Sequence, residues 1–391
     1  MEPHAVVKLA SGKEKKIRNR YPWVMREEVR RVEGRQEPGI CRLVDDQGNF
    51  LAVGTYNPKS RFPVRVLSRE DEPINEEFFS RRIGEAVDFR NRMIEATNSC
   101  RLIFSESDRL PGLIVDQYDQ HLIVQVRSKV MEMLKPLWLP ALIEESGAKS
   151  IYEKSEMAGR EEEGLEPFTA QLYGKTPDRI EVVETDFHFE SLIHDGLKTG
   201  FYLDQRNSRR MFAALVQPGD KVLDCFCYTG GFSVYAANEG AHVTGVDILP
   251  EAVKQAREHA KMNKVRAEFV EANAFDFLAQ GAENRGPFDW IVLDPPAIAK
   301  TYDKRNSLKW AVWKLVHAAI PLLKPGGRLV VCSCSYQLNQ QLLLDQCRLA
   351  ASDQGRSLVL EEMTYQDLDH PAPLWFPEAL YLKSAWLRME E

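Results

Sequence analysis

The stretch LDCFCYTGGFS, residues Leu223–Ser233, decides the fold of this chain. It joins an apolar segment typical of a β-strand (Lys221–Phe226) to a segment typical of a helix, through a turn that contains Gly230 and Gly231. Glycines in such a turn allow the backbone to approach a ligand closely. Because the turn lacks the Gly-x-Gly-x-x-Gly fingerprint, a dinucleotide is not the first ligand to expect.

Strand and helix patterns alternate on both sides of this stretch. The helical pattern is clearest in PEAVKQAREHAKMN (Pro250–Asn263), and this alternation predicts a mostly parallel sheet with helices on both faces. In such sheets ligands bind beyond the carboxyl ends of the strands. The predicted strands are residues 221–226, 242–247, 267–272, 288–294 and 327–333.

Three aspartates stand at or near the ends of these strands. Asp224 belongs to the first, Asp247 to the second, and Asp294 comes before two prolines at the end of the fourth. An acidic side chain in the place of Asp247 can accept hydrogen bonds from both hydroxyls of a ribose. Any one of them is more often a helix cap than a ligand contact. Together and in this order they resemble the motifs of class I S-adenosylmethionine methyltransferases.

That resemblance implies a cofactor site built from the loops after the strands. Asn273 stands where an acidic residue is typical in these enzymes, and its amide can still hydrogen-bond adenine. The expected cofactor-binding residues are Asp224, Phe226, Tyr228, Thr229, Gly230, Gly231, Asp247, Ile248, Asn273, Ala274, Asp294 and Gln205.

The fifth predicted strand ends as RLVVCSCSY and contains Cys332 and Cys334. Such a pair is ordinarily interpreted as two small side chains that are buried in the core. Cys225 and Cys227, in the expected cofactor loop, are interpreted as packing or cofactor-side residues. No metal is expected, because no second cysteine pair or nearby Cys–His set completes four zinc ligands. Cys334, however, stands at the carboxyl end of its strand, towards Asp294.

A thiol in that place suits methylation of cytosine at carbon 5. Addition of a thiolate to carbon 6 makes carbon 5 nucleophilic enough to accept a methyl group, and Asp294 can hold or protonate N3 during the addition. Enzymes that methylate amino groups usually follow Asp/Asn-Pro-Pro with an aromatic residue. Here that position is Ala297.

Charge is unevenly distributed along the chain. The net charge of −7 argues against a nucleic-acid partner, but residues 1–70 carry +6 and the remainder −13. A solvated face is the ordinary interpretation of a basic run, yet Tyr21 and Trp23 follow it and offer flat faces for bases. The cations expected to contact RNA in the run are Lys13, Lys15, Lys16, Arg18 and Arg20.

The first 190 residues predict smaller elements. Residues 1–70 favour a β-rich domain with a hairpin near Gly48, and residues 71–99 a connecting helix. Residues 100–190 favour a small α/β domain: a hairpin turning near Asp119, a helix over 129–146 that Pro136 and Pro140 would interrupt, a loop over 159–168, and one alternating strand over 179–190.

Several long motifs resemble one family over nearly the whole chain, the PUA-domain ribosomal RNA cytosine-C5 methyltransferases that act on the large subunit. These motifs are YPWV (21–24), SESDRLPGLIVDQY (105–118), KTGFYLDQRNSR (198–209), LDCFCYTGGFS (223–233), LDPPA (293–297) and CSCS (332–335). The resemblance implies an RNA-binding PUA domain at 1–70, a central α/β domain at 100–190 and a Rossmann-like, S-adenosylmethionine-dependent methyltransferase domain at 191–391. It implies that Cys334, not Cys332, is the nucleophile. It also puts Lys198, Tyr202 and either Gln205 or Arg206 near the cofactor or RNA, although a hairpin edge is the ordinary interpretation of that segment.

Other interpretations remain open at this point. The segment SLKWAVWKLVHAAI (307–320), with Trp310 and Trp313, departs from the family, so a non-catalytic RNA-binding or assembly factor and a methyltransferase of another RNA or of a small molecule stay as alternatives. The length exceeds one ordinary domain, no apolar run predicts a membrane span, and the cysteine usage favours a reduced cytoplasmic location. The sequence leaves open whether the protein is a homodimer.

Overall fold

The computed structural model describes residues 2–194, 200–280, 285–296 and 305–390. The chain forms two compact units. The N-terminal unit comprises residues 1–185, 190–203 and 368–379, and the C-terminal unit comprises residues 186–189, 204–367 and 380–391. No helix in the described ranges is both long and apolar enough to cross a membrane.

The N-terminal unit begins with a six-stranded sheet in the order β2-β6-β5-β4-β1-β3. The predicted hairpin near Gly48 is confirmed, since β4 and β5 pair antiparallel around it. The core of this sheet is formed by apolar side chains that include Val7, Leu43 and Val64. Its elements are β1 (Ala5–Leu9), α1 (Glu14–Arg18), β2 (Trp23–Val24), β3 (Val29–Gly34), β4 (Gly39–Val44), β5 (Phe50–Tyr56) and β6 (Val64–Ser68).

A second, five-stranded sheet follows in the order β11-β10-β9-β8-β7. The expected connecting helix is α2 (Glu76–Met93), which buries Phe79 and Ile83 against this part of the unit. The other elements are β7 (Ser99–Phe104), β8 (Leu113–Tyr118), β9 (His121–Val126), α3 (Lys129–Met133), α4 (Lys135–Ser146), β10 (Ser150–Ser155) and β11 (Phe168–Tyr173).

Two details of this region differ from the sequence-based expectation. The helix over 129–146 is divided at Leu134, but Pro140 lies inside α4 and does not end it. The prediction of one continuous strand over 179–190 is wrong, because the chain forms a hairpin of two strands there. These are β12 (Arg179–Glu184) and β13 (Phe187–Leu192). Thr185 turns the chain with a φ of 55°, a left-handed conformation that an alternating pattern does not reveal.

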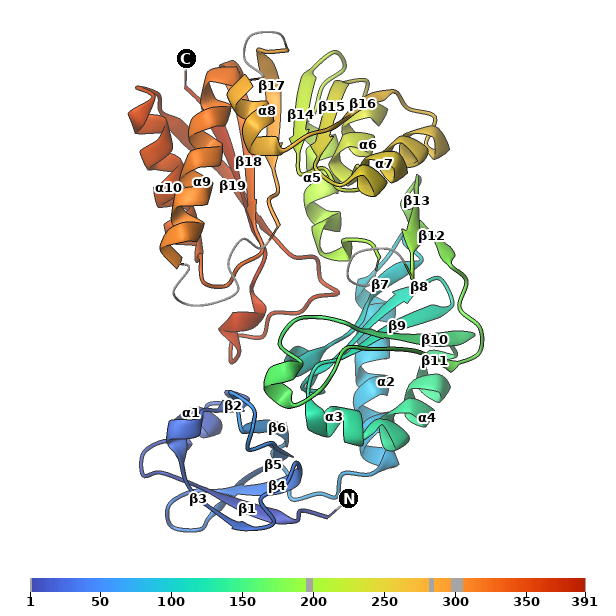
Figure 1. Cartoon of the computed structure of the whole chain (residues 1–391), viewed down its shortest axis with the longest axis vertical. Helices are drawn as coiled ribbons and strands as arrows, with labels where there is room; N and C mark the ends of the chain where they lie inside the picture. The colour runs from blue at the N-terminus through green and yellow to red at the C-terminus, as the bar shows by residue number, and fades with distance from the viewer. Residues whose placement is uncertain (1, 195–199, 281–284, 297–304, 391) are drawn as a thin grey trace. The chain divides into compact units, whose positions relative to one another are not determined.

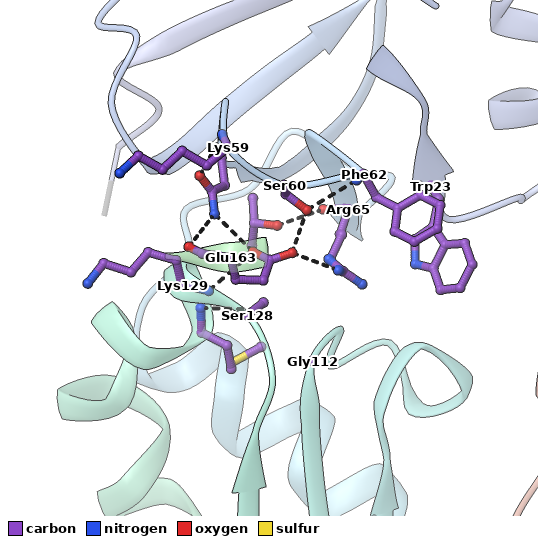
Figure 2. A network of polar contacts seen from close by, with 12 residues as sticks. Trp23, Lys59, Ser60, Phe62, Arg65, Gly112, Ser128, Lys129 and Glu163 are labelled. Atoms are coloured by element: carbon purple, nitrogen blue, oxygen red, sulfur yellow. Dashed lines mark hydrogen bonds and ion pairs between the residues drawn. The ribbon is translucent and has the colours of Figure 1, made fainter. Parts of the chain in front are cut away.

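Glu163 is the centre of a buried polar network that joins the two sheets of the N-terminal unit. Its carboxylate accepts hydrogen bonds from Asn57 (2.9 Å), Arg65 (2.9 Å) and the Ser60 hydroxyl, and Arg65 also pairs with Glu106 at 3.0 Å. Figure 2 shows Arg65 and Ser60 pointing towards Glu163. Although burial opposes ionisation, Arg65 and these hydrogen bonds hold the pKa of Glu163 below its usual range. The network therefore fixes β6 against the turn that contains Glu163.

The C-terminal unit is built on a seven-stranded sheet in the order β16-β15-β14-β17-β18-β20-β19. The first five of these strands are parallel, and β20 runs antiparallel to both β18 and β19. All five predicted strands and the predicted helix are confirmed. The five predicted strands are β14 (Lys221–Cys225), β15 (His242–Asp247), β16 (Ala267–Glu271), β17 (Phe288–Leu293) and β18 (Leu323–Ser333), and the sheet also contains β19 (Leu358–Tyr365) and β20 (Lys383–Met389).

Helices cover both faces of this sheet, as Figure 1 shows. Leu223 and Leu293 pack in one core with α8, α9 and α10, whereas Val222 and Val292 pack in the other with α5 and α6. Alternate residues of one strand thus enter opposite cores, the arrangement of a doubly wound sheet. The helices are α5 (Arg206–Leu215), α6 (Gly231–Asn238), α7 (Pro250–Met262), α8 (Ala274–Gln280), α9 (Arg305–Ala319) and α10 (Gln340–Asp353).

Candidate active site

The loop between β14 and α6 has an unusual backbone. Phe226 and Tyr228 have φ angles of 64° and 48°, and Gly230 one of 80°. A side chain at Gly230 would lie 3.1 Å from both Ala256 and the Phe269 ring, so the loop is closely packed from behind. Left-handed conformations at non-glycine residues are costly and gather at ligand-binding segments. The structure thus has a turn at the glycines, as the sequence predicts, and its role in binding stays a prediction.

Asp247 connects this loop to the next one. One carboxylate oxygen accepts the Tyr228 amide (2.9 Å) and the other accepts the Leu249 amide (2.9 Å). Ile248, directly after it, is 58% exposed, which is unusual for an isoleucine. The carboxylate retains lone pairs for ribose hydroxyls, and Ile248 offers an apolar surface for a flat ring.

Asp224 is buried within β14 with one oxygen satisfied. Its Oδ2 accepts the Ser233 hydroxyl at 2.7 Å, whereas Oδ1 is buried and has no hydrogen-bond partner among the described residues. Burial raises the pKa of Asp224 from 3.8 to about 7; Asp294 and Asp247 also raise it, and Ser233 lowers it. A buried acceptor without a donor is unfavourable unless a ligand supplies the donor.

The loop after β16 contributes Asn273 and Ala274. The Asn273 carbonyl oxygen accepts the Phe275 amide at 2.9 Å, while its amide N–H groups donate no hydrogen bond within the described parts of the chain. Asn273 is exposed and Ala274 is buried at the start of α8. Asn273 therefore has donors free for a ligand such as adenine.

Phe226 and Thr229 belong to the packing of this edge of the sheet. The Phe226 ring meets Phe275 edge-on at 6.0 Å, and the Thr229 carbonyl lies 2.8 Å from the imidazole of buried His259.

Gln205 and Asp294 lie together at the end of β17. Gln205 ends a short 3-10 turn (Leu203–Gln205) that leads into α5, and its Nε2 donates to Asp294 Oδ2 at 3.0 Å. The Gln205 side chain is buried and its Oε1 has no hydrogen-bond partner in the described structure. The segment interpreted as a hairpin edge is thus a turn and a helix. It brings Gln205, but not Arg206, to Asp294: Arg206 is fully buried and pairs with Asp367 at 2.7 Å.

Cys334 differs from the other six cysteines of the chain, all of which are buried. It follows β18 directly and is partly exposed. Burial raises the pKa of the Cys332 thiol well above its ordinary value and Asp294 raises it further, only partly offset by Ser384 and Gln205. Cys332 is therefore held as an unreactive thiol, since the thiolate is the nucleophile.

Cys225, which ends β14, and Cys227, in the loop that follows, are unreactive for the same reason. Burial raises the pKa of Cys225 and of Cys227 well above the ordinary range, and neighbouring Asp224 adds to the effect. Their packing interpretation agrees with this.

The register of the sheet relates Asp294 to Cys334. Leu293 pairs with Val331 across β17 and β18. Asp294 therefore follows its strand at the level of Cys332, and Cys334 comes two residues further along the neighbouring chain. Both groups stand at the carboxyl edge of the sheet, beside the loops of Asp224 and Asp247.

The predicted RNA-contacting residues of the N-terminal unit fall into two groups. Lys13, Lys15 and Arg20 are exposed and form no ion pair with any described residue. Lys16 pairs with Glu28 and Arg18 with Asp45, at 2.5 and 2.9 Å.

Tyr21 and Trp23 have partners within their own unit. Trp23 stacks on Phe62 with 4.2 Å between ring centroids, and its indole N–H donates to Glu106 at 2.8 Å. Figure 2 shows the two rings lying face to face. The Tyr21 hydroxyl donates to Glu378 at 2.8 Å. These aromatic groups thus make contacts within the N-terminal unit that the sequence did not indicate.

Four further residues stand out in the sequence, namely Lys198, Ala297, Trp310 and Trp313. Lys198 and Ala297 lie outside the described residues. Trp310 is 58% exposed on α9, whereas Trp313 stacks on His317 and donates to Asp353. In the described ranges no cluster of three or more histidine, cysteine or acidic side chains has the arrangement of a metal site.

One charged residue at this edge, Lys383, is not among those predicted from the sequence. Lys383 begins β20, is 3% exposed, and its ammonium donates to the carbonyls of Ser335 and Leu338 in the loop that begins with Cys334. The sequence signal that could have found it is a lysine within the mostly apolar segment YLKSAWL (381–387).

Comparison with known proteins gives matches to both units. A PUA-like domain matches residues 7–69 and a methyltransferase domain matches residues 217–375. The ribosomal RNA large subunit methyltransferase I of Pseudoalteromonas translucida is 37% identical, covering 97% of this chain and 98% of its own length. The protein of the same name from Vibrio vulnificus is 36% identical over the same shares.

A solved structure has the same fold over nearly the whole chain. The crystal structure of SMU.776 complexed with SAH superposes with a TM-score of 0.86 at 20% identity, covering 98% of this chain and 99% of the other. At this identity the likeness concerns the fold.

Proposed function

The chain belongs to the ribosomal RNA large subunit methyltransferase I family, and on this premise we propose that it forms 5-methylcytosine in large-subunit ribosomal RNA with Cys334 as the nucleophile. It is a methyltransferase, with a PUA-like domain and a methyltransferase domain in one chain. The observation that carries the choice of reaction is the single partly exposed thiol among seven, placed one residue beyond β18 on the sheet edge that also holds Asp294.

The residues at this edge fit S-adenosylmethionine. The buried, unsatisfied Oδ1 of Asp224 suits a donor of the cofactor, and Asp247 suits its ribose hydroxyls. Ile248 and Asn273 suit the face and the edge of adenine. When bound, the cofactor supplies an electrophilic methyl group. The residues that would hold it are Asp224, Phe226, Tyr228, Thr229, Gly230, Gly231, Asp247, Ile248, Asn273 and Ala274.

Cys334 performs the covalent part of the reaction. Its thiolate adds to carbon 6 of cytosine, a carbon–sulfur bond forms, and the electron pair of the 5,6 double bond makes carbon 5 nucleophilic. After carbon 5 has been methylated, a base removes its proton. The electron pair then restores the double bond and the thiolate leaves.

Asp294 holds the pyrimidine during addition. A carboxyl group at N3 accepts or donates the proton that compensates the charge developing on the ring. Gln205 orients this carboxyl through its hydrogen bond to Oδ2. Asp294 therefore acts on the substrate, and Gln205 acts through Asp294.

The exposed cations of the PUA-like domain bind the RNA backbone. Lys13, Lys15 and Arg20 present positive charge without an internal ion pair in the described structure. Phosphate contacts of this kind give affinity without sequence information, so the base to be modified is chosen elsewhere.

A direct test uses unmodified large-subunit ribosomal RNA, transcribed in vitro, with the full-length protein and methyl-labelled S-adenosylmethionine. After digestion to nucleosides, the label is expected in 5-methylcytidine. Label in another nucleoside would contradict the carbon 5 reaction. If the protein binds the cofactor but transfers no label to RNA or to assembly intermediates, the non-catalytic alternative is favoured.

A further inference from the structure

Lys383 is a buried ammonium group with no part in the steps proposed for Cys334 and Asp294. Its Nζ lies 2.6 Å from the Ser335 carbonyl oxygen and 2.7 Å from that of Leu338. No carboxylate of the described residues lies within ion-pair distance of it. An ammonium has three protons to donate, and two carbonyl groups account for two of them.

The place of Lys383 in the sheet relates it to the nucleophile. Lys383 is the register partner of Ser333, the last residue of β18, and Cys334 comes next. The two carbonyls that it binds belong to residues one and four positions after Cys334. Ser335 also accepts the Leu338 amide at 3.2 Å, and Asn339 then caps α10. Lys383 therefore ties the turn that begins with the thiol to a different strand.

A positive charge buried without a negative partner is unfavourable. Burial lowers the pKa of Lys383 to about 8, and the charge of Cys334 acts in the opposite direction. The charge that favours the protonated lysine is thus that of the proposed nucleophile. By reciprocity, a protonated Lys383 favours the thiolate over the thiol.

We propose that Lys383 is a positioning residue for Cys334, which holds the turn that carries the thiol and stabilises the thiolate by its positive charge. This inference rests on the proposed function for the role of Cys334. It concerns the state of the thiol before any RNA or cofactor binds, and can be measured without either.

Other titratable groups lie on the elements packed around Lys383. On β19, Tyr365 pairs in register with Lys383 and donates its hydroxyl to Gln340. On β18, Cys332 stays protonated because of its raised pKa. Further charged or titratable groups on these and neighbouring elements include Asp294 after β17, the Arg206–Asp367 pair, Asp345, Cys347 and Arg348 on α10, and Arg328, Glu361 and Arg388 at the opposite end of the strands.

The experiment measures the rate at which iodoacetamide alkylates Cys334 in the full-length protein between pH 5 and 10. The modified peptide is quantified by mass, so that the six buried cysteines do not interfere. In the wild-type protein the apparent pKa of Cys334 is expected below about 8.5, the value of an ordinary cysteine. A value at or above that of an ordinary cysteine overturns the proposal.

Two variants separate charge from support of the turn. Lys383→Gln keeps a donor for one carbonyl but removes the charge, and Lys383→Met removes both. In each the profile is expected to move up by about one pH unit, so that alkylation at pH 7 slows about tenfold. A merely structural role would leave the profile of Lys383→Gln unchanged, and that result overturns the charge effect.

The control is Lys324→Met, which removes a lysine of β18 that pairs with Asp289. It is expected to leave the Cys334 profile unaltered. Should Lys383→Met fail to fold, the wild-type profile and Lys383→Gln still decide the matter. If 5-methylcytidine is not the product and the wild-type thiol pKa nevertheless depends on Lys383, the proposed function fails while this inference stands.

Discussion

Gln205 donates a hydrogen bond from Nε2 to Oδ2 of Asp294, at 3.0 Å, across 89 positions of sequence. The donor comes from the turn before α5 and the acceptor from the end of β17. This bond holds one oxygen of the carboxyl group at the carboxyl edge of the sheet. It makes the segment before α5 part of the candidate active site.

Gln205→Ala should therefore impair turnover more than binding. A hydrogen bond to a charged group contributes about 1.5–3 kcal/mol, so kcat is expected to fall about 10- to 100-fold in steady-state methyl transfer, with the cofactor Kd changed by less than about threefold. Gln217→Ala, at an exposed glutamine, is the control. A kcat within twofold of the wild type would contradict the role of Gln205.

The two cysteines of CSCS should respond differently to the same substitution. Cys334→Ala is expected to bind S-adenosylmethionine normally, measured by calorimetry, and to lose at least about 1,000-fold in turnover, because the nucleophile is removed. Cys332→Ala should keep most activity and lose about 1 kcal/mol of unfolding free energy, since it only packs. Activity in Cys334→Ala would exclude it as the nucleophile.

The C-terminal sheet could be predicted because its signals are local. Each parallel strand is an apolar run, and the aspartates and glycines fall at its end, so their order alone places Asp224, Asp247 and Asp294 at one edge. The β12–β13 hairpin could not be predicted in this way. Thr185 adopts the left-handed conformation of its turn, but the alternating pattern of the sequence continues on both sides of it.

The residues of the site that could not be predicted from the sequence depend on contacts between residues far apart in the chain. Lys383 acts on Cys334 only because β20 inserts antiparallel beside β18, a pairing that no local pattern encodes. The partners of Trp23, which are Phe62 and Glu106, likewise lie on other elements. Exposure of an aromatic ring cannot be inferred from its neighbours in sequence.

Asp224 predicts an unusual dependence of stability on pH. Burial raises its pKa from 3.8 to about 7, so the folded protein binds this proton more tightly than the unfolded chain. Its contribution to stability is therefore complete below about pH 4 and is lost as the pH rises towards 7. Three pKa units correspond to at most about 4 kcal/mol.

Asp224→Asn should remove this penalty. Without cofactor, the variant is expected to be more stable than the wild type at pH 8, and the difference should shrink towards pH 5, as measured by urea unfolding. Ser233→Ala, which removes the hydrogen bond that favours the carboxylate, should act in the opposite direction at pH 8. Equal stability of Asp224→Asn and the wild type across this range would contradict the raised pKa.

The charge of the PUA-like domain should govern how RNA binding depends on salt. Lys13, Lys15 and Arg20 are exposed without an ion pair in the described structure, so their charges are available to phosphates. Replacing all three by glutamine should weaken binding of a large-subunit ribosomal RNA transcript. The slope of log affinity against log salt should fall by about two to three, because about 0.7–0.9 counterions are released per phosphate contact.

The matched control places the same loss of charge elsewhere. Lys254, Lys261 and Lys264, in α7 and directly after it, are exposed, and their replacement by glutamine should leave the slope nearly unchanged. Because the overall charge is −7 in the wild type and −10 in both triple variants, a difference between them cannot arise from net charge. Equal weakening by the two sets would mean that RNA responds to the charge of the whole protein, and that the basic surface of the first 70 residues has no separate role.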